Sequence, residues 1–268
     1  MGKIFRLALA IITGVVISST TMLWTEAEGQ EVLRYSSSAQ VHEVLLEDTL
    51  QAFTKETGIK VDLFVCSSSA ATYRLFNGVC DVASTAERLE ASGVDYGYVE
   101  TFLCKIPLVV VANVETHLKS ITEKQLQDVF TGHLANWKYL GDSDKEMVAV
   151  VPGKNTAAFK NFTHLAIRSY DIKYDFMTYH STMILEAIRR IPWSISFIGA
   201  GAPTNNAAIR ILRVNGYAPT DKEYPYIQTL SFVTRGEPAG AVKKFIDFAK
   251  SKTNLERLKA KGAIILEN

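Results

Sequence analysis

Short apolar runs alternate with helical patterns along almost the whole chain. Residues 60–66 (KVDLFVC) form one such run, a helical pattern covers about 69–77, and residues 81–84 (DVAS) form the next run. A helix between two strands allows the second strand to lie parallel to the first, so this alternation predicts an α/β fold. We therefore expect mostly parallel sheets that carry helices on their faces.

The individual elements are predicted from periodicity and from the Gly and Pro residues that end each pattern. The long apolar run 102–113 (FLCKIPLVVVAN) is typical of a strand buried in a parallel sheet. The predicted strands are 31–36, 60–66, 81–84, 102–113, 146–153, 193–199, 209–214 and 226–234. The predicted helices are 41–56, 69–77, 121–130 with Thr122 as its N-cap, 155–167, 182–190, and a last one that contains Val242, Phe245, Ile246 and Ala249.

These elements fall into two sets, which predicts two lobes. The second set begins near Thr122, and the last strand and helix return the chain to the first set. We expect lobe I to comprise residues 28–114 and 229–268, and lobe II to comprise residues 115–228. The two connections between the lobes would then act as a hinge.

The N-terminal residues have the pattern of a secretory signal peptide. Lys3 and Arg6 precede an apolar run from Leu7 to Ile17, and small and polar residues continue to Ala27. That run is too short to span a bilayer, and no later run is long enough. We therefore expect cleavage near Ala27, which removes residues 1–27, and a soluble exported protein of the periplasm.

The charge of the mature chain is balanced. Without the predicted signal peptide, the sequence has 27 basic and 27 acidic residues, because Lys3, Arg6 and Glu26 are removed from the totals of 29 and 28. A formal charge of zero argues against a general surface for nucleic acids or anionic membranes.

The cysteines and histidines do not have the spacing of a metal site. Cys66, Cys80 and Cys104 allow at most one internal disulfide, and the alternative is that they are small apolar residues in or beside strands. The five histidines are scattered, and neither paired C-x-x-C nor H-E-x-x-H spacing occurs. No G-x-S-x-G motif is present either. The sequence thus predicts no metal, no cofactor and no catalytic residues.

Three predicted helices begin with small polar residues directly after a strand. These starts are SSSAQ at 36–40, SSSA at 67–70 and GKNTA at 153–157. Ser, Thr and Asn are ordinary N-cap residues, so each start alone is explained by capping. However, the unpaired N–H groups and the partial positive charge of a helix N-terminus also bind anions. Three such starts at the carboxyl ends of strands, in both predicted lobes, therefore predict an anion site.

Several segments also carry a family resemblance. They are residues 52–70 (AFTKETGIKVDLFVCSSSA), 80–89 (CDVASTAERL), 118–141 (LKSITEKQLQDVFTGHLANWKYLG), 150–165 (VVPGKNTAAFKNFTHL) and 191–201 (IPWSISFIGAG). The most specific pattern is formed by Ile121, Thr122, Gln125, Leu126, Val129, Phe130, Gly132, Asn136 and Trp137. Together they resemble the type II periplasmic solute-binding proteins, and within them the phosphate-binding proteins of ABC importers. The resemblance covers nearly the whole mature chain and implies a ligand cleft between two α/β lobes.

The resemblance also implies which residues hold the ligand. Family members bind a dehydrated oxyanion with backbone N–H groups and Ser or Thr hydroxyls from four loops. The matching positions here are Ser37, Ser38, Ala39 and Gln40, then Ser67, Ser68 and Ser69, then Ser84 and Thr85, and finally Lys154, Asn155 and Thr156. Arg88 and Ser181 are possible additional contacts. The surplus serines would act as neutral donors to a buried anion, whose oxygens all need hydrogen bonds.

Two positions depart from the family pattern. Phosphate-binding members have an aspartate in the third loop, where this chain has Ala86, and an arginine before the fourth loop, where it has VPGKNT. Lys154 would supply the positive charge, although an ammonium does not reproduce the bidentate geometry of a guanidinium. Sulfate, another tetrahedral oxyanion or a carboxylated solute therefore stays open as the ligand.

Together the sequence and the resemblance predict an exported binding protein that captures a small oxyanion, phosphate first, for an ABC importer. We expect a monomer without enzymatic activity, whose partners are the small anion and a permease in the membrane. One alternative is a sensing module of the same fold that reports ligand occupancy to a sensor protein. An exported phosphatase-like enzyme is the least supported alternative, because no base, metal set or nucleophile motif is visible.

Overall fold

The computed structural model describes residues 30–88, 96–169, 171–178, 181–200 and 206–265. The predicted signal peptide, residues 1–27, lies outside the described residues. Among the described residues, no helix combines the length and the apolar composition needed to cross a bilayer.

The described strands form one continuous sheet. Their order is β2-β1-β3-β10-β4-β8-β6-β7, with β9 beside β4 and β5 beside β9. The strands are β1 (Val32–Ser38), β2 (Lys60–Cys66), β3 (Val82–Thr85), β4 (Tyr98–Asn113), β5 (Ser120–Ile121), β6 (Val148–Pro152), β7 (Phe176–Thr178), β8 (Ser194–Gly199), β9 (Ile209–Val214) and β10 (Ile227–Arg235). β1 is parallel to β2 and β3, and β6 is parallel to β7 and β8, whereas β4 and β10 are antiparallel to their neighbours.

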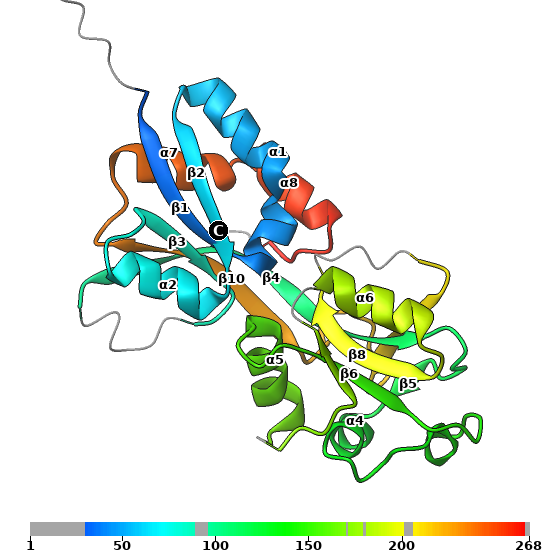
Figure 1. Ribbon diagram of the computed structural model, residues 1–268. Helices are drawn as coiled ribbons and strands as arrows, with labels where there is room; N and C mark the ends of the chain where they lie inside the picture. The colour runs from blue at the N-terminus through cyan, green and yellow to red at the C-terminus, as the bar shows by residue number, and fades with distance from the viewer. Residues whose placement is uncertain (1–29, 89–95, 170, 179–180, 201–205, 266–268) are drawn as a thin grey trace, which may run out of the picture.

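Helices cover both faces of this sheet. They are α1 (Ala39–Thr57), α2 (Ser68–Phe76), α4 (Glu123–Phe130), α5 (Ala157–Phe162), α6 (Ser181–Arg190), α7 (Gly240–Ala249) and α8 (Lys252–Ala260), with a 3-10 turn η1 (Trp137–Leu140) and a π-helix η2 (Thr163–Ile167). Figure 1 shows two halves. We call the half with β1, β2 and β3 lobe I, and the half with β6, β7 and β8 lobe II.

Lobe I has helices on both faces of its part of the sheet. α1, α7 and α8 share one apolar cluster with Leu33 and Tyr35 of β1, whereas α2 packs in a separate cluster with Ala83 and Val233. α1 begins directly after β1 because Ser38 caps it, and it ends where Gly58 takes a left-handed conformation with φ 74°. The junction between β1 and α1 therefore lies at the carboxyl edge of the sheet.

Lobe II is built around aromatic side chains. Phe162 stacks on Phe197 with 3.8 Å between ring centroids, and Phe130 meets both rings edge-on. α4 and α5 pack in this cluster, and α6 packs through Ile184 and Ile188 in another. α5 is thereby fixed on the sheet of lobe II with its first residues at the carboxyl end of β6.

A buried carboxylate ties two loops of lobe II together. The Asp142 side chain is 3% exposed, and its Oδ2 accepts hydrogen bonds from Thr116 Oγ1 at 2.7 Å and from the N–H groups of His117 and Leu118 at 2.7 and 2.9 Å. The Ser143 N–H donates to its other oxygen at 2.7 Å. Burial disfavours the charged carboxylate, but these donors outweigh burial and hold the pKa of Asp142 well below its usual range.

β4 and β10 connect the two lobes. Residues 98–107 of β4 pair with β10, and residues 108–113 pair with β8 and β9. The change of partner therefore occurs beside Pro107, at the level of Ile227 in β10. The predicted lobe boundaries at residues 114 and 228 stay a prediction.

Most predicted elements are confirmed within a few residues, and β2 and β9 have the predicted bounds. The expectation that residues 102–113 lie among parallel strands is wrong, because β4 is antiparallel to β8, β9 and β10. Its continuous burial arises instead from its central place in the sheet. The predicted helix 155–167 begins as α5 but continues as the π-helix η2. The helix α8 was not predicted.

Candidate functional site

At the junction of β1 and α1, neutral polar groups form a buried network. Tyr35 donates a hydrogen bond to Ser84 Oγ at 2.7 Å, and the Ser38 N–H donates to the same oxygen at 3.2 Å. Ser37 Oγ lies 2.9 Å from the Tyr35 hydroxyl and 3.1 Å from Ser84 Oγ. Burial raises the pKa of Tyr35 to about 12 despite the opposing effect of these hydrogen bonds. The structure thus brings the predicted residues Ser37, Ser38 and Ser84 together.

The serines 67–69 have three different roles. Ser67 caps α2, because its Oγ accepts from the Ala70 N–H at 3.2 Å. Ser68 is buried, and its Oγ accepts from the Ala86 N–H at 3.0 Å, which leaves its own hydroxyl hydrogen to donate. Ser69 is exposed and donates to the Glu87 carboxylate at 3.1 Å. Capping therefore explains only one of the three.

The loop after β3 completes the lobe I side. Thr85 Oγ1 accepts from the Glu87 N–H at 2.9 Å and donates to the Glu87 carbonyl at 2.8 Å. This compact turn places the Ala86 N–H against Ser68 and the Glu87 carboxylate against Ser69. The predicted residues Ser84 and Thr85 thus position a loop that meets the N-terminus of α2.

In lobe II, the predicted loop is the start of α5. Thr156 is its N-cap, accepting from the Phe159 N–H at 3.2 Å and donating to the Gly153 carbonyl at 2.7 Å. Lys154 and Asn155 are exposed, and Lys154 Nζ lies 5.7 Å from the centroid of the Tyr174 ring, in its own lobe. Thr156 alone is therefore held in a fixed orientation.

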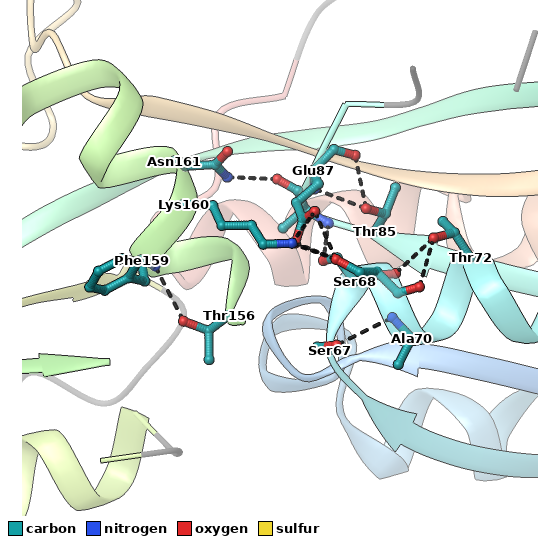
Figure 2. Close-up of polar contacts among 12 residues, drawn as sticks. Ser67, Ser68, Ala70, Thr72, Thr85, Glu87, Thr156, Phe159, Lys160 and Asn161 are labelled. Carbon is teal, nitrogen blue, oxygen red and sulfur yellow. Dashed lines mark hydrogen bonds and ion pairs between the residues drawn. The ribbon is translucent and has the colours of Figure 1, made fainter. Parts of the chain in front are cut away.

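The two lobes touch at the start of α5 (Figure 2). Ala157 packs in the apolar cluster of lobe I. Lys160 Nζ lies 2.5 Å from Ser69 Oγ and 3.0 Å from Glu87 Oε2. Asn161 Nδ2 donates to the Ala86 carbonyl at 2.7 Å and to Gln228 Oε1 at 2.9 Å. These contacts bring the starts of α2 and α5 together at the boundary between the two lobes, which we call the cleft.

The first turn of α1 adds a buried amide. Gln40 is 7% exposed, and neither of its amide atoms has a hydrogen-bond partner among the described residues. A Cβ at Gly199 would meet Gln40 Nε2 and Gln228 Nε2, each at 3.3 Å, so these side chains meet where β8 of lobe II ends. Unpaired buried amide groups are costly, and hence they mark a place where a polar partner is favourable.

Of the remaining two predicted contacts, Arg88 lines a cavity next to the helix starts, and the side chain of Ser181 is not described. Arg88 lines a cavity of about 550 Å³ together with Glu100 and residues of β10 and η2, and Ala86, Asn161 and Gln228 of the contact between the lobes line the same cavity. None of the residues that line this cavity belongs to the first turn of α1, α2 or α5. Ser181 is the first residue of α6, and its side chain lies outside the described part of the structure.

The sequence did not predict Lys160, Asn161, Glu87 or Gln228 as residues of the site. A signal was present for Lys160, because it follows the cap Thr156 by four residues and so lies one turn further along the same helix face. No comparable signal existed for Gln228, because its position at the cleft depends on the return of β10 between the lobes.

The thiols are free and largely buried. Among the described residues, no group of three His, Cys, Asp or Glu side chains is placed to hold a metal ion. Cys66, Cys80 and Cys104 are free thiols, and burial raises the pKa of Cys104 to about 12. Cys80 and Cys104 are buried, which confirms their interpretation as small apolar residues.

Known proteins share this architecture. A phosphate-binding protein, PstS, from Borreliella burgdorferi is 23% identical over 270 residues, which cover 94% of this chain and 97% of the relative. A substrate-binding protein from Clostridium perfringens, solved with bound phosphate, superimposes with a TM-score of 0.80 at 19% identity, covering 88% of this chain and all of that one. An ABC-type phosphate transport receptor from Vibrio cholerae gives 0.73 at 19% identity, covering 87% of this chain and all of that one.

These similarities agree with the two-lobed architecture that the sequence predicts. The family model for the PBP superfamily domain matches residues 25–253, which is most of the chain. This protein therefore belongs to the PBP superfamily.

Proposed function

We propose that this protein is an exported solute-binding protein that captures phosphate for an ABC importer. It binds the anion between its lobes, closes on it and presents the closed form to a permease in the membrane. It acts as a monomer in the periplasm, after removal of a signal peptide, and carries out no chemical reaction on its ligand. The matched relatives support this proposal, because they are named as phosphate-binding proteins and resemble the chain over almost its full length.

The observation that carries the proposal is the convergence of helix N-termini on the cleft. α1 and α2 begin on the lobe I side, each behind a serine cap, and α5 begins on the lobe II side behind Thr156. The caps orient the first turns, and the remaining N–H groups of each turn are free to donate to an anion. Helix N-termini and hydroxyls are neutral donors, which suits an oxyanion that has to be bound without its water shell.

We assign the ligand contacts to the loops predicted from the sequence. Lobe I supplies the N–H groups of Ala39 and Gln40 and the hydroxyls beside them, together with Ser68. Lobe II supplies Thr156 and the first turn of α5. The Gln40 amide, which is buried and has no partner among the described residues, provides a further donor at the base of the cleft. Ser37 and Ser84 position this loop through the Tyr35 network.

The test is calorimetric titration of the mature protein, freed of ligand by partial unfolding and refolding, with phosphate, sulfate, molybdate and tungstate. We expect one-to-one binding of phosphate. Heat from another of these anions and none from phosphate would keep anion capture but refute phosphate as the ligand. No binding of any of the four would refute the proposed function.

Two substitutions test the site itself. Replacing Ser68 or Thr156 by alanine removes a hydroxyl at the cleft, so phosphate binding should weaken by about 1–3 kcal/mol. The matched control is Thr122→Ala, because Thr122 caps α4 away from the cleft in the same way that Thr156 caps α5. The control should lose stability without losing affinity, and equal affinities in all three variants would refute the assigned contacts.

A further inference from the structure

One lysine reaches across the cleft. Among the described cations of lobe II, Lys160 is the one whose ammonium contacts lobe I, at 2.5 Å from Ser69 Oγ and 3.0 Å from Glu87 Oε2. Lys154, which the sequence suggested as the source of positive charge, is exposed and lies against Tyr174 in its own lobe. The charge at the cleft therefore comes from α5 one turn after its cap, and not from the loop before it.

Glu87 occupies donors that an anionic ligand would use. Its carboxylate accepts from Ser69, in the first turn of α2, and from the ammonium of Lys160 (Figure 2). A negative group is favourable at a helix N-terminus, and this one also has a cation beside it. The chain thus supplies a carboxylate of its own to a lysine and a helix start that face each other across the cleft.

The contact is of a kind that a ligand can replace. The Lys160 side chain is 40% exposed and the Glu87 side chain is 23% exposed, so both groups remain partly solvated. Partly exposed ion pairs contribute little net stability, because water replaces most of what is lost when they separate. Lys160 also has three N–H donors, which leaves one beyond the two contacts made here.

We propose that Lys160 binds the captured anion directly and that Glu87 is its internal competitor. This inference rests on the proposed function. In the ligand-free protein the carboxylate of Glu87 pairs with Lys160 and helps to close the cleft, together with the contacts of Ala157 and Asn161. The entering anion takes the Lys160 ammonium and the Ser69 hydroxyl, and Glu87 turns to solvent. The affinity for the anion therefore depends on how much more strongly Lys160 binds the anion than it binds the Glu87 carboxylate.

The first test is a double-mutant cycle on phosphate affinity. Glu87→Gln keeps the shape but removes the competing charge, so phosphate should bind about tenfold more tightly. Lys160→Met should weaken binding by about tenfold. In the double variant, Glu87→Gln should bring no gain, because the lysine it competes for is gone. The control is Lys243→Met, which breaks a pair of 2.5 Å with Asp247 on α7, and it should leave affinity unchanged.

Either of two results would overturn the inference. If Lys160→Met binds phosphate as tightly as the unaltered protein, Lys160 is not a ligand contact. If Glu87→Gln tightens binding equally with and without Lys160, Glu87 acts as a general negative charge and not as a competitor for the lysine.

The second test needs no ligand and separates this inference from the proposed function. Small-angle X-ray scattering of the ligand-free protein should show a larger radius of gyration for Lys160→Met and for Glu87→Gln than for the Lys243→Met control. Unchanged radii would refute the closing role of the pair. If the radii increase but phosphate binds to none of the proteins, the pair closes the cleft and the assignment of phosphate as the ligand is wrong.

Discussion

The two lobes bury polar clusters of opposite kinds. In lobe I, at the cleft, Tyr35, Ser37 and Ser84 form a cluster of neutral hydroxyls. In lobe II, in the loops around η1, the cluster is centred on the Asp142 carboxylate, which accepts from two hydroxyls and three backbone N–H groups and also contacts the His117 ring. A carboxylate takes up every donor around it and repels an anion, whereas hydroxyls can donate in one direction and accept in another. The chain therefore uses a charge where it only needs to join loops, and neutral groups where we place the anion.

The largest effect is expected in the charged cluster. Asp142→Asn removes the charge that several buried donors share and turns an NH₂ group toward some of them. We expect a loss of about 3 kcal/mol in the free energy of unfolding, measured by urea denaturation. Asp144→Asn is the control, because Asp144 in the same loop is 69% exposed and pairs with the exposed side chains of Lys138 and Asn136. Equal losses in both variants would contradict the special role of Asp142.

A smaller loss is expected in the neutral cluster. Ser84→Ala leaves the Tyr35 hydroxyl and the Ser38 N–H without their common acceptor, which should lower the free energy of unfolding by about 2 kcal/mol. Ser231→Ala is a matched control, because Ser231 is 1% exposed and its hydroxyl has no partner among the described residues. Ser231→Ala should leave the free energy of unfolding nearly unchanged. Guanidinium denaturation of the two variants side by side distinguishes a hydrogen-bond loss from simple loss of packing.

Removing a cap should cost less than removing a member of either cluster. Thr156→Ala should lower the free energy of unfolding by about 1 kcal/mol, and Thr156→Ser by a few tenths of that, since serine caps as well as threonine. Thermal unfolding followed by circular dichroism measures both. If Thr156→Ala destabilises the protein as much as Ser84→Ala does, the start of α5 is a rigid part of the fold and the contrast between the two sides of the cleft fails.

The finest distinction between the clusters is the direction of their pH dependence. The pKa of Asp142 is lowered by folding, so its stabilisation is present above about pH 4, the unfolded value, and is lost as the pH falls toward its folded pKa. The pKa of Tyr35 is raised to about 12, so its stabilisation is present below about pH 10 and is lost between about pH 10 and 12.

Urea denaturation across the pH range checks this. The stability difference between the unaltered protein and Asp142→Asn should narrow in acid, and the difference from Tyr35→Phe should narrow in alkali. Parallel curves at either end would contradict the corresponding assignment.

The local pattern of the sequence predicted much of the fold. Apolar periodicity, together with the Gly and small polar residues that mark the ends of elements, correctly predicted β2, β9 and the N-cap Thr122. These features depend on residues that are neighbours in the chain. The same pattern failed for the pairing of β4, since continuous burial is common to central strands of either direction. The π-helix η2 was also missed, because periodicity does not distinguish an α-helical turn from a π-helical one.

For the cleft, the sequence identified hydroxyls but not their partners. It could indicate that Ser67, Ser68 and Ser69 do more than cap one helix. It could not indicate that Ser68 meets Ala86 or that Ser69 meets Lys160, because these contacts depend on how β3 and α5 are placed by distant strands. The family resemblance supplied the position of the cleft, and the contact of Lys160 with Glu87 required the structure.

The position of β10 in the sheet also determines the order in which the two lobes can fold. β10 lies between β3 and β4, although all of lobe II separates it from them in the chain. A chain that emerges from a translocation pore with its N-terminus first releases every strand of lobe II before it releases β10. Lobe II can then fold while lobe I still lacks a central strand, with the edge of β3 unpaired. The half that carries most of the proposed anion contacts is thus the last to form, and during the proposed export the edge of β3 stays open to edge-to-edge pairing until β10 arrives.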